Sequence, residues 1–552
     1  MLRHLINPLR TLSLLFGIFK KKALERYRAF IDRRFQTSIN RILAKINLPQ
    51  KPRGVVAFFG CGFSRDDAVS ALVMTRLADM HWLPISITSY MVMPQQASKS
   101  LNYLNGFLVR YSRINYRQRD DKLESNTLRF KWKIDMQGGL CVAAGIDFFP
   151  VVNSKLQRIH KAYLIDYSDP EITKMLSEII LSADAALGAC FALKDYSDKR
   201  GIPLRFTGSE HVYVPTGVAL LFCEHFAPIE NVEFIDFGDA YAHYFTSGEY
   251  IDQHLFAIQN LTKSGNASRH VVSSKDFDAW VASISANVVK IEKEKAQQFL
   301  AKQSWTGGAE INAADQSVLD QIAECRQLDR PVVCIFGHVT FDAGTPNDLG
   351  FVHADMVDWL NDTLRYLSGK NVFVLVKPHP AEKRHKPSRK PNQNFEQLIH
   401  VCCGSNIHLL DALQFNTHQL IDMVDVGLFW RSSAALEFGL LGKPAIVCGS
   451  SATYANVINF FYPRTLAAYH EYLDNLAGLD SCISIPDRVA LFWKFMREEQ
   501  FISLPYVERS KSKRVDGFKY WSGHKHWSEG MVKRFYESGD ENIDLIASIL
   551  TR

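Results

Sequence analysis

The second half of the chain alternates short apolar runs with helix-like segments, and this alternation constrains the fold more than any other feature. Helical patterns such as ADMVDWLNDTLRYLSG (354–369) and the glycine-punctuated SSAALEFGLLGKP (432–444) separate runs that have the length and composition of buried strands. The runs are PVVCIFGH (331–338), NVFVLVKPHP (371–380), NIHLLD (406–411), DVGLFW (425–430) and PAIVCG (444–449). Such alternation predicts a parallel sheet with helices on both faces.

The first half shows a less regular form of the same pattern. GVVAFFGCGFSRDDAVSALVMTRLADMHW (54–82) predicts a strand, a glycine loop and a helix, and a second helix is predicted within 171–201. Three further runs are predicted to be strands: LPISIT (83–88), GIDFFPVV (145–152) and VALLFCE (218–224). A chain of 552 residues is too long for one ordinary hydrophobic core, so this pattern predicts a second parallel α/β domain.

Residues 276–303 resemble one long amphipathic helix, and WTGGAE (305–310) then breaks the pattern. We therefore expect a first Rossmann-like domain over 51–320 and a second one over 321–485. A head over 1–50 precedes them, and C-terminal helices over 486–552 cross back to the first domain. Two facing Rossmann-like domains leave a central cleft, with ligands beyond the carboxyl ends of the strands.

The head of the chain is strongly basic. Residues 1–50 hold eleven Lys or Arg residues and two acidic ones, a net charge of +9, so the rest of this +6 chain carries −3. The apolar stretch LINPLRTLSLLFGIF is too short and too interrupted to span a bilayer, and Lys20-Lys21-Lys22 follows it, which disfavours a cleaved signal. A helix lying on an anionic membrane surface fits this segment, and so does a helix packed on the body.

The ten cysteines show no CxxC or Cys/His zinc spacing, which favours reduced thiols in a cytoplasm and no structural metal.

A histidine between two prolines lies at the end of the run VFVLVKPHP (372–380). Pro378 and Pro380 each fix their own φ and restrict the residue before them, so His379 leaves the sheet edge with little freedom. An imidazole held in this way can donate to a phosphate oxygen or protonate a departing one. We therefore predict that Lys377 and His379 help to bind a nucleotide, although a surface turn is the simpler alternative.

Two serines follow the run DVGLFW at the start of the next helix. Ser432 and Ser433 place hydroxyl donors where backbone N–H groups also favour an anion, whereas plain N-capping needs only one serine. Glu437 lies about one turn further, where a carboxylate can accept hydrogen bonds from ribose hydroxyls or form a salt bridge. Together with His379, these residues predict a pocket for a nucleotide phosphate.

The chain resembles bacterial capsule and surface-polysaccharide biosynthesis proteins, which are glycosyltransferases of the two-Rossmann type called GT-B. The likeness covers about residues 205–460. It is carried by HVTFDAGTPNDLGF…DMVDWLNDTLRYL, VKPHPAE, SSAALEFGLLGKPAIV…TYANV, GSEHVYVPTG (208–217) and FIDFGDAYAHYF (234–245). Related Kdo transferases and polysialyltransferases hold the nucleotide phosphate with a His-Pro motif and a serine-bearing helix, which implies that role for His379, Ser432 and Ser433.

This resemblance also implies that the acceptor base comes from the first domain. Glu210, His211 and Asp239 are the candidates, since a carboxylate or imidazole there can take the proton of an acceptor hydroxyl. Asp66 and Asp67 are weaker candidates, because helix N-capping explains them as well, and Asp342 is expected to pack or hydrogen-bond near the domain entrance. The sequence shows no paired-aspartate metal motif, so we expect neither a metal nor a cofactor besides a CMP- or UDP-linked sugar as substrate.

The sequence therefore predicts a metal-independent transferase that moves a sugar from a nucleotide sugar to a surface polysaccharide or lipid-linked glycan. We expect it in the cytoplasm, peripheral to the inner face of the membrane, with no nucleic-acid partner. Three alternatives remain open at this point: a polyol-phosphate transferase of the teichoic-acid type, a nucleotide-sugar epimerase, and a non-catalytic glycan-export scaffold.

Overall fold

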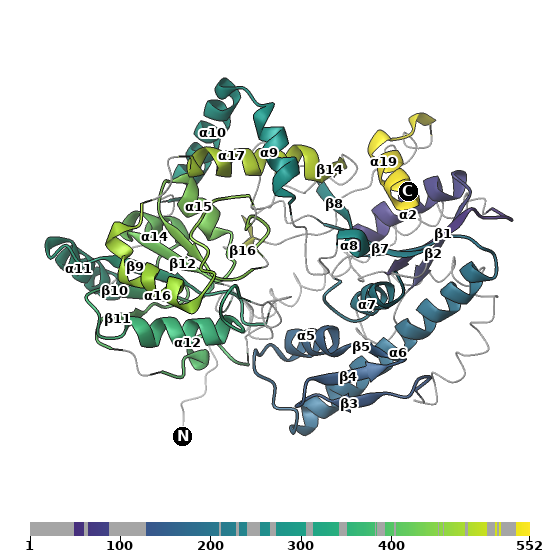
Figure 1. Ribbon diagram of the computed structural model, residues 1–552, viewed down its shortest axis with the longest axis horizontal. Coiled ribbons are helices and arrows are strands. Elements are labelled where there is room, and N and C mark those ends of the chain that lie inside the picture. The colour runs from purple at the N-terminus through teal and green to yellow at the C-terminus, as the bar shows by residue number, and fades with distance from the viewer. Residues whose placement is uncertain are drawn as a thin grey trace, which may run out of the picture.

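The computed structural model contains two α/β units that lie side by side (Figure 1). It describes residues 49–59, 64–87, 128–208, 211–227, 231–239, 254–264, 272–304, 313–341, 350–380, 382, 392–401, 404–450, 452–455, 457–480, 484–504, 514–515, 518–519 and 537–552. The basic head predicted over 1–50 lies almost entirely outside these residues.

The first unit is built on a six-stranded sheet with the order β14-β8-β7-β6-β1-β2. Four strands are parallel: β1 (Gly54–Phe59), β2 (Trp82–Ile87), β6 (Leu204–Gly208) and β7 (Val232–Asp239). Strand β8 (His254–Asn260) is antiparallel to β7, and β14 (Phe501–Leu504) is antiparallel to β8. A small antiparallel sheet of β3 (Lys133–Asp135), β4 (Leu140–Ala143) and β5 (Ile146–Asp147) lies beside it.

Both faces of this sheet are covered by helices. Val55, Ala57 and Phe59 of β1 point into a core with α5 (Phe149–His160), α6 (Pro170–Asp198) and α7 (Thr216–Phe226). Val56 and Phe58 point the other way, toward α2 (Ser64–Asp79) and α19 (Glu541–Thr551). Because both faces are buried, β1 is apolar along its whole length instead of alternating. A short helix, α8 (Leu261–Ser264), follows β8.

The second unit has a five-stranded, fully parallel sheet with the order β11-β10-β9-β12-β13. Its strands are β9 (Val332–Phe336), β10 (Phe373–Lys377), β11 (Ile407–Leu409), β12 (Val426–Phe429) and β13 (Ala445–Val447). Each of the five falls inside a run that the sequence predicted to be a strand. The largely parallel first sheet and the fully parallel second sheet confirm the predicted α/β class with two Rossmann-like units.

Helices cover both faces of the second sheet as well. One face packs against α12 (Met356–Leu367) and α16 (Leu466–Asp474). The helices of the other face are α9 (Ser274–Ala282), α10 (Ala286–Ser304), α11 (Ala313–Gln327), α14 (Thr417–Met423), α15 (Ala434–Leu440) and α17 (Ile485–Phe495). Since α9, α10 and α11 contribute to this core, packing assigns these helices to the second unit, whereas the sequence placed residues up to 320 in the first.

The chain returns to the first unit near its C-terminus. A π-helical turn (Met496–Gln500) leads from α17 to β14, which joins the first sheet, and α19 packs against α2. Arg76 of α2 donates to Asp544 of α19 at 3.0 Å from Nη2 to Oδ2. The remaining elements are 3-10 turns at Glu396–Leu398 and Leu476–Gly478 and the hairpin β15 (Arg514–Val515) and β16 (Phe518–Lys519).

Three local predictions were wrong. The runs 145–152 and 218–224 were predicted to be strands, but the second half of the first and all of the second are helical, in α5 and α7. A short run that is apolar on every side cannot distinguish a buried strand from a buried helix. The single helix predicted over 276–303 is two helices, α9 and α10, separated at Ser283–Ser285.

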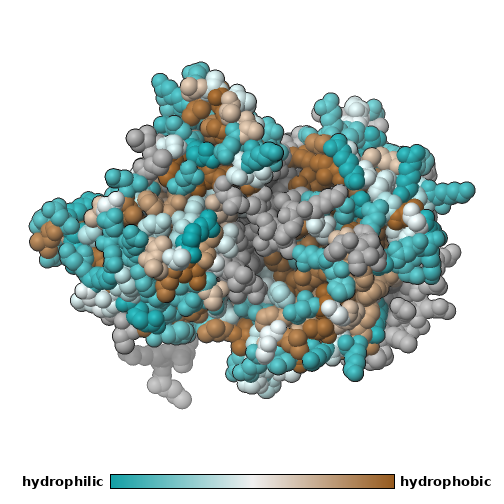
Figure 2. All heavy atoms as spheres, in the orientation of Figure 1, coloured by the Kyte–Doolittle hydropathy of each residue, from teal (hydrophilic) through white to brown (hydrophobic). Residues whose placement is uncertain are grey.

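Helix α6 is long and apolar enough to span a membrane by length and composition. However, 56% of its most apolar window is buried inside the protein, where it packs between α5 and α7. It therefore has the character of a core helix. On the face shown in Figure 2, exposed apolar residues gather on the margin of the first unit that borders the second, while the outer margins are mostly hydrophilic.

Candidate functional site

The carboxyl ends of the second sheet bring several predicted residues to one edge. Strand β9 lies in the middle; the chain runs outward from it through β10 to β11, then crosses to β12 on its other side. The topological switch point is therefore between β9 and β12, which is where open parallel sheets bind ligands. The segments that follow β9, β10 and β12 carry His338, His379 and the pair Ser432 and Ser433.

His379 follows the last residue of β10 by two positions and is half-buried. Its carbonyl accepts a hydrogen bond from the N–H of Glu382 at 3.0 Å, so the Pro-His-Pro segment closes in a turn. The ring centroids of His379 and His338 are 6.3 Å apart, and the rings are tilted by 31°. The sequence analysis did not single out His338, although its place directly after a buried strand was a usable signal. Two imidazoles therefore border this edge.

Lys377 has a role that the sequence did not predict. Its side chain is 4% exposed, and its Nζ donates to the carbonyls of Asp411 (3.1 Å), Ala412 (2.7 Å) and Gln414 (2.7 Å). An ammonium has three hydrogens, so these three carbonyls use its donors. The direct nucleotide contact predicted for Lys377 is replaced by a clamp on the loop 411–414. Phe415, just beyond that loop, has a left-handed φ of 51°.

Ser432 and Ser433 lie between β12 and α15, as predicted, and both are half-buried. The Ser432 Oγ accepts from the N–H of Ala434 at 3.2 Å, and the Ser432 carbonyl accepts from the hydroxyl of Tyr454 at 2.7 Å. Ser433 is the N-cap residue of α15 but makes no side-chain cap bond. The Oγ of Ser432 is therefore used to cap the helix start, whereas the hydroxyl of Ser433 makes no cap bond and is consistent with the predicted contact with an anion. The preceding residue, Arg431, is a buried cation that the sequence analysis missed.

Glu437 lies one turn into α15. Its Oε2 atom is 3.8 Å from Nδ1 of His418, near the start of α14. Burial raises the pKa of Glu437 to about 7 and lowers the pKa of His418. Glu382, beside the His379 turn, is a second buried carboxyl group: it is 7% exposed, accepts from the N–H of Phe395 at 3.0 Å, and has its pKa raised to about 7 by burial.

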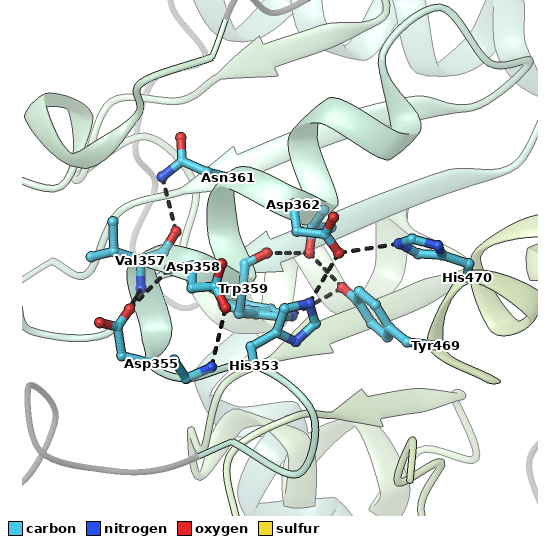
Figure 3. Close-up of polar contacts among 11 residues, drawn as sticks. His353, Asp355, Val357, Asp358, Trp359, Asn361, Asp362, Tyr469 and His470 are labelled. Atoms are coloured by element: carbon cyan, nitrogen blue, oxygen red, sulfur yellow. Dashed lines mark hydrogen bonds and ion pairs between the residues drawn. The ribbon is translucent and has the colours of Figure 1, made fainter. Parts of the chain in front are cut away.

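A network of two histidines and one aspartate holds the segment before α12 (Figure 3). Oδ2 of Asp362 contacts Nε2 of His353 at 3.0 Å and Nε2 of His470 at 3.1 Å. The same segment pairs with the end of β13 through Gly350 and Gly449. Burial acts to raise the pKa of Asp362, but hydrogen bonds from both histidines outweigh it and hold the pKa below its usual range. This network fixes one border of the carboxyl edge.

In the first unit, the structure describes part of the predicted acceptor side. His211 follows β6, and its Nδ1 is 3.1 Å from Oδ1 of Asp236 on β7; both side chains are buried. The sequence analysis quoted FIDFGDAYAHYF (234–245) but did not single out Asp236 within it. Asp239 is the last residue of β7. Glu210 and Asp342, and the side chains of Asp66, Asp67 and Asp239, lie outside what the structure describes.

Helix α5 links the His211 segment to the carboxyl edge of the second sheet. Near its start, Val151 lies against Gly217, and further along Lys155 and Arg158 lie over the ring of Tyr213 at 5.8 and 5.9 Å. Beyond its end, the N–H groups of Tyr163 and Leu164 donate to Gln393 Oε1 at 3.0 and 2.8 Å, and the Gln393 carbonyl accepts from Thr340 of the loop after β9. A helix of twelve residues is about 18 Å long, so the two edges lie at opposite ends of one short element.

Among the residues that the structure describes, no group of three or more His, Cys, Asp or Glu side chains is arranged to hold a metal ion.

Comparison with solved structures found weak similarities. The chain is 13% identical to a beta Kdo 2,7 transferase, KpsC of Thermosulfurimonas dismutans, over 55% of this chain and 79% of that one, with a TM-score of 0.28. It is also 13% identical to the UDP-GlcNAc 2-epimerase of Neisseria meningitidis (81% and 98% covered, TM-score 0.21) and 9% identical to the glycosyltransferase of kitacinnamycin (81% and 95%, TM-score 0.23). At these scores the similarities carry no argument about activity, which depends on the residues above.

No model of a known protein family matches the sequence, and no curated protein matches it significantly.

Proposed function

We propose that this protein is a glycosyltransferase that moves a sugar from a nucleotide sugar to a surface polysaccharide or lipid-linked glycan. The observation that carries the proposal is the position of His379, Ser432 and Ser433 at the carboxyl edge of the second sheet, after β10 and β12, the two strands that flank β9. Imidazole and hydroxyl donors at that place suit the phosphate of a nucleotide. CMP- or UDP-linked sugars are the donors that the sequence resemblance implies.

In this mechanism the second unit stabilises the leaving group. As the bond between the sugar carbon and the phosphate oxygen breaks, negative charge develops on the phosphate. His379 and the serine hydroxyls donate hydrogen bonds to it, which is the kind of preorganised stabilisation that contributes most to such reactions. No metal is needed for this step, because these donors do what a bound cation does elsewhere.

The first unit supplies the base. His211 takes the proton of the acceptor hydroxyl as the oxygen attacks the sugar carbon. Asp236 accepts a hydrogen bond from Nδ1 of His211 at 3.1 Å, which favours the tautomer with its lone pair on Nε2. Of the three predicted bases, His211 is the one whose described surroundings support the role.

Calorimetric titration with CMP, UDP and GDP tests the proposal, because a non-catalytic scaffold is expected to bind none of them. His379→Ala should lower kcat by about a hundredfold or more, because a positioned acid or donor contributes about that much. The exposed His400, mutated to Ala, is the matched control and should keep full activity. Near-normal transfer by purified His379→Ala would remove the phosphate role.

Product analysis separates the two enzymatic alternatives. Phosphodiester linkages in place of glycosidic ones would indicate a polyol-phosphate transferase. Conversion of the nucleotide sugar without any acceptor would indicate an epimerase.

We also propose that residues 1–50 attach the protein to the inner face of the cytoplasmic membrane. Their net charge of +9 and their apolar stretch support this. Replacing Lys20, Lys21 and Lys22 by Gln should weaken sedimentation with vesicles that contain anionic lipid. Equal sedimentation of both forms, or none of the unmodified protein, would contradict it.

A further inference from the structure

Two buried polar atoms of neighbouring helices face each other without a hydrogen bond. Nδ1 of His418 and Oε2 of Glu437 are 3.8 Å apart, and neither atom has a hydrogen-bond partner among the described residues. An N–H···O hydrogen bond in proteins usually spans about 2.7–3.2 Å. Buried polar atoms are nearly always paired, so an unpaired couple at this separation calls for a physical explanation.

The pair lies beside the proposed nucleotide site. His418 is the second residue of α14 and Glu437 the fourth of α15, and both helices pack on the same face of the second sheet. Ser433 precedes α15 directly. The side chain of Glu437 is 21% exposed although its Oε2 is buried, so the surface that a ligand can reach belongs to the rest of the side chain.

The charged groups of the surrounding helices are engaged with one another. Two residues of α10 form ion pairs: Glu292 with Arg497 at 3.0 Å, and Lys293 with Asp487 of α17 at 2.7 Å. Arg488 of α17 pairs with Asp278 of α9 at 2.8 Å. Lys443, beyond the end of α15, donates to the Val424 carbonyl. Asp422, one turn further along α14, is the charged group that acts on His418.

Burial disfavours the charged form of both groups. It raises the pKa of Glu437 to about 7. It lowers the pKa of His418, an effect that Asp422 partly opposes. Two titratable groups that interact at close range titrate as a pair.

We propose that His418 and Glu437 share one proton across this contact, and that His418 thereby decides whether Glu437 presents a carboxylate to the hydroxyl groups of the nucleotide. With the proton on Nδ1, Glu437 is a carboxylate, and its outer oxygen accepts from a ligand hydroxyl. With the proton on Oε2, Glu437 is a neutral acid, and the imidazole is neutral with its hydrogen on Nε2. His418 is thus a positioning residue, and this role rests on the proposed function.

Two substitutions of His418 separate this role from simple packing. His418→Leu leaves Oε2 facing an apolar side chain, which favours the neutral acid, so nucleotide binding should need a higher pH. If its midpoint rises by one pH unit, affinity below the midpoint falls about tenfold. His418→Gln offers an amide N–H to Oε2 but cannot take up the proton, so it should restore binding at neutral pH and lower the midpoint.

The assay is calorimetric titration with CMP, UDP and GDP between pH 5.5 and 8.5, with His400→Leu as the surface control. The expected order of affinity at pH 7 is unmodified protein and His418→Gln above His418→Leu, with separate pH midpoints. Superimposable pH profiles for all three forms would overturn the proposal.

A second measurement needs no ligand. Unfolding of the unmodified protein, His418→Leu, Glu437→Gln and the double variant gives a coupling energy that should change over the same pH range. Coupling of zero at every pH would overturn the shared proton. If coupling is present but the unmodified protein binds none of the three nucleotides, the proposed function fails, and with it the role toward a ligand, while the shared proton stands.

Discussion

Replacing Lys377 by Met tests whether this residue is a structural clamp or a ligand for phosphate. Met keeps most of the buried stem and removes the charge. The carbonyls of Ala412 and Gln414 then lose the donor that Lys377 supplies, while that of Asp411 keeps a hydrogen bond from the N–H of Gln414 at 3.0 Å. Replacing a surface lysine whose only contact is with a ligand would lower the free energy of unfolding by no more than about 0.5 kcal/mol.

The magnitude follows from the surroundings of each carbonyl. The hydrogen bond to Ala412 is buried, while those to Asp411 and Gln414 are part-buried, so water can partly replace the lost donor at the latter two carbonyls. A buried acceptor left without a donor costs about 1–3 kcal/mol. The relieved desolvation of the ammonium offsets some of this loss. We therefore expect a loss of about 2–4 kcal/mol, or roughly 5–10 °C in the unfolding midpoint of the second unit.

The assay is urea or thermal unfolding of the full chain, followed by nucleotide titration of the folded variant. Lys443→Met is the matched control, because that ammonium donates to a single carbonyl, Val424, at 2.8 Å and should cost about 1 kcal/mol. A Lys377→Met protein as stable as the unmodified one, yet unable to bind nucleotide, would refute the clamp and restore the phosphate contact.

Four further changes test the other parts of the site. Glu382→Gln should leave stability unchanged near pH 4 and raise it by up to about 3 kcal/mol above pH 7. Burial raises the pKa of Glu382 from about 4.5 to about 7, so as the pH rises this carboxyl group ionises in the unfolded chain before it does so in the folded protein. Equal urea midpoints of the two forms at pH 8 would contradict this. Asp362→Asn should lose most stability above pH 4 and little at lower pH, because the pKa of Asp362 is held down in the folded state; a loss independent of pH would exclude that cause. Asp236→Asn should lower kcat by about a hundredfold with little change in KM, since it disturbs the His211 tautomer; a change confined to KM would argue against a base at His211. Gln393→Ala should leave the nucleotide Kd unchanged and lower kcat, because it loosens the contact between the units; equal turnover would show that this contact is dispensable.

The second sheet was predictable because its strands are buried on both faces. In β9, Val332, Cys334 and Phe336 face one core while Val333 and Ile335 face the other, so every residue is apolar and the run is unmistakable. The run 218–224 is equally apolar but forms α7. Its conformation is decided by packing among α6, β6 and β7, which local sequence does not encode.

The positions of His379, Ser432 and Ser433 were predictable because one short segment holds all the information for each. Pro378 and Pro380 restrain His379 regardless of the rest of the chain, and Ser432 and Ser433 follow closely after the end of a strand. The carbonyl contacts of Lys377 were not predicted because its partners lie in the loop after the next strand, 34 to 37 residues away. The contacts of His211 with Asp236 and of His418 with Glu437 escaped for the same reason.

The division of labour between the units follows from where their side chains lie. Imidazole and hydroxyl donors gather at the carboxyl edge of the second sheet, whereas the buried pair of His211 and Asp236 belongs to the first. The proposed transfer reaction needs both, since one stabilises the departing phosphate while the other receives the acceptor proton. Helix α5 touches the His211 segment along its length, and the segment beyond its end contacts Gln393. Helix α5 and the segment that follows it therefore connect the two half-sites of the proposed reaction.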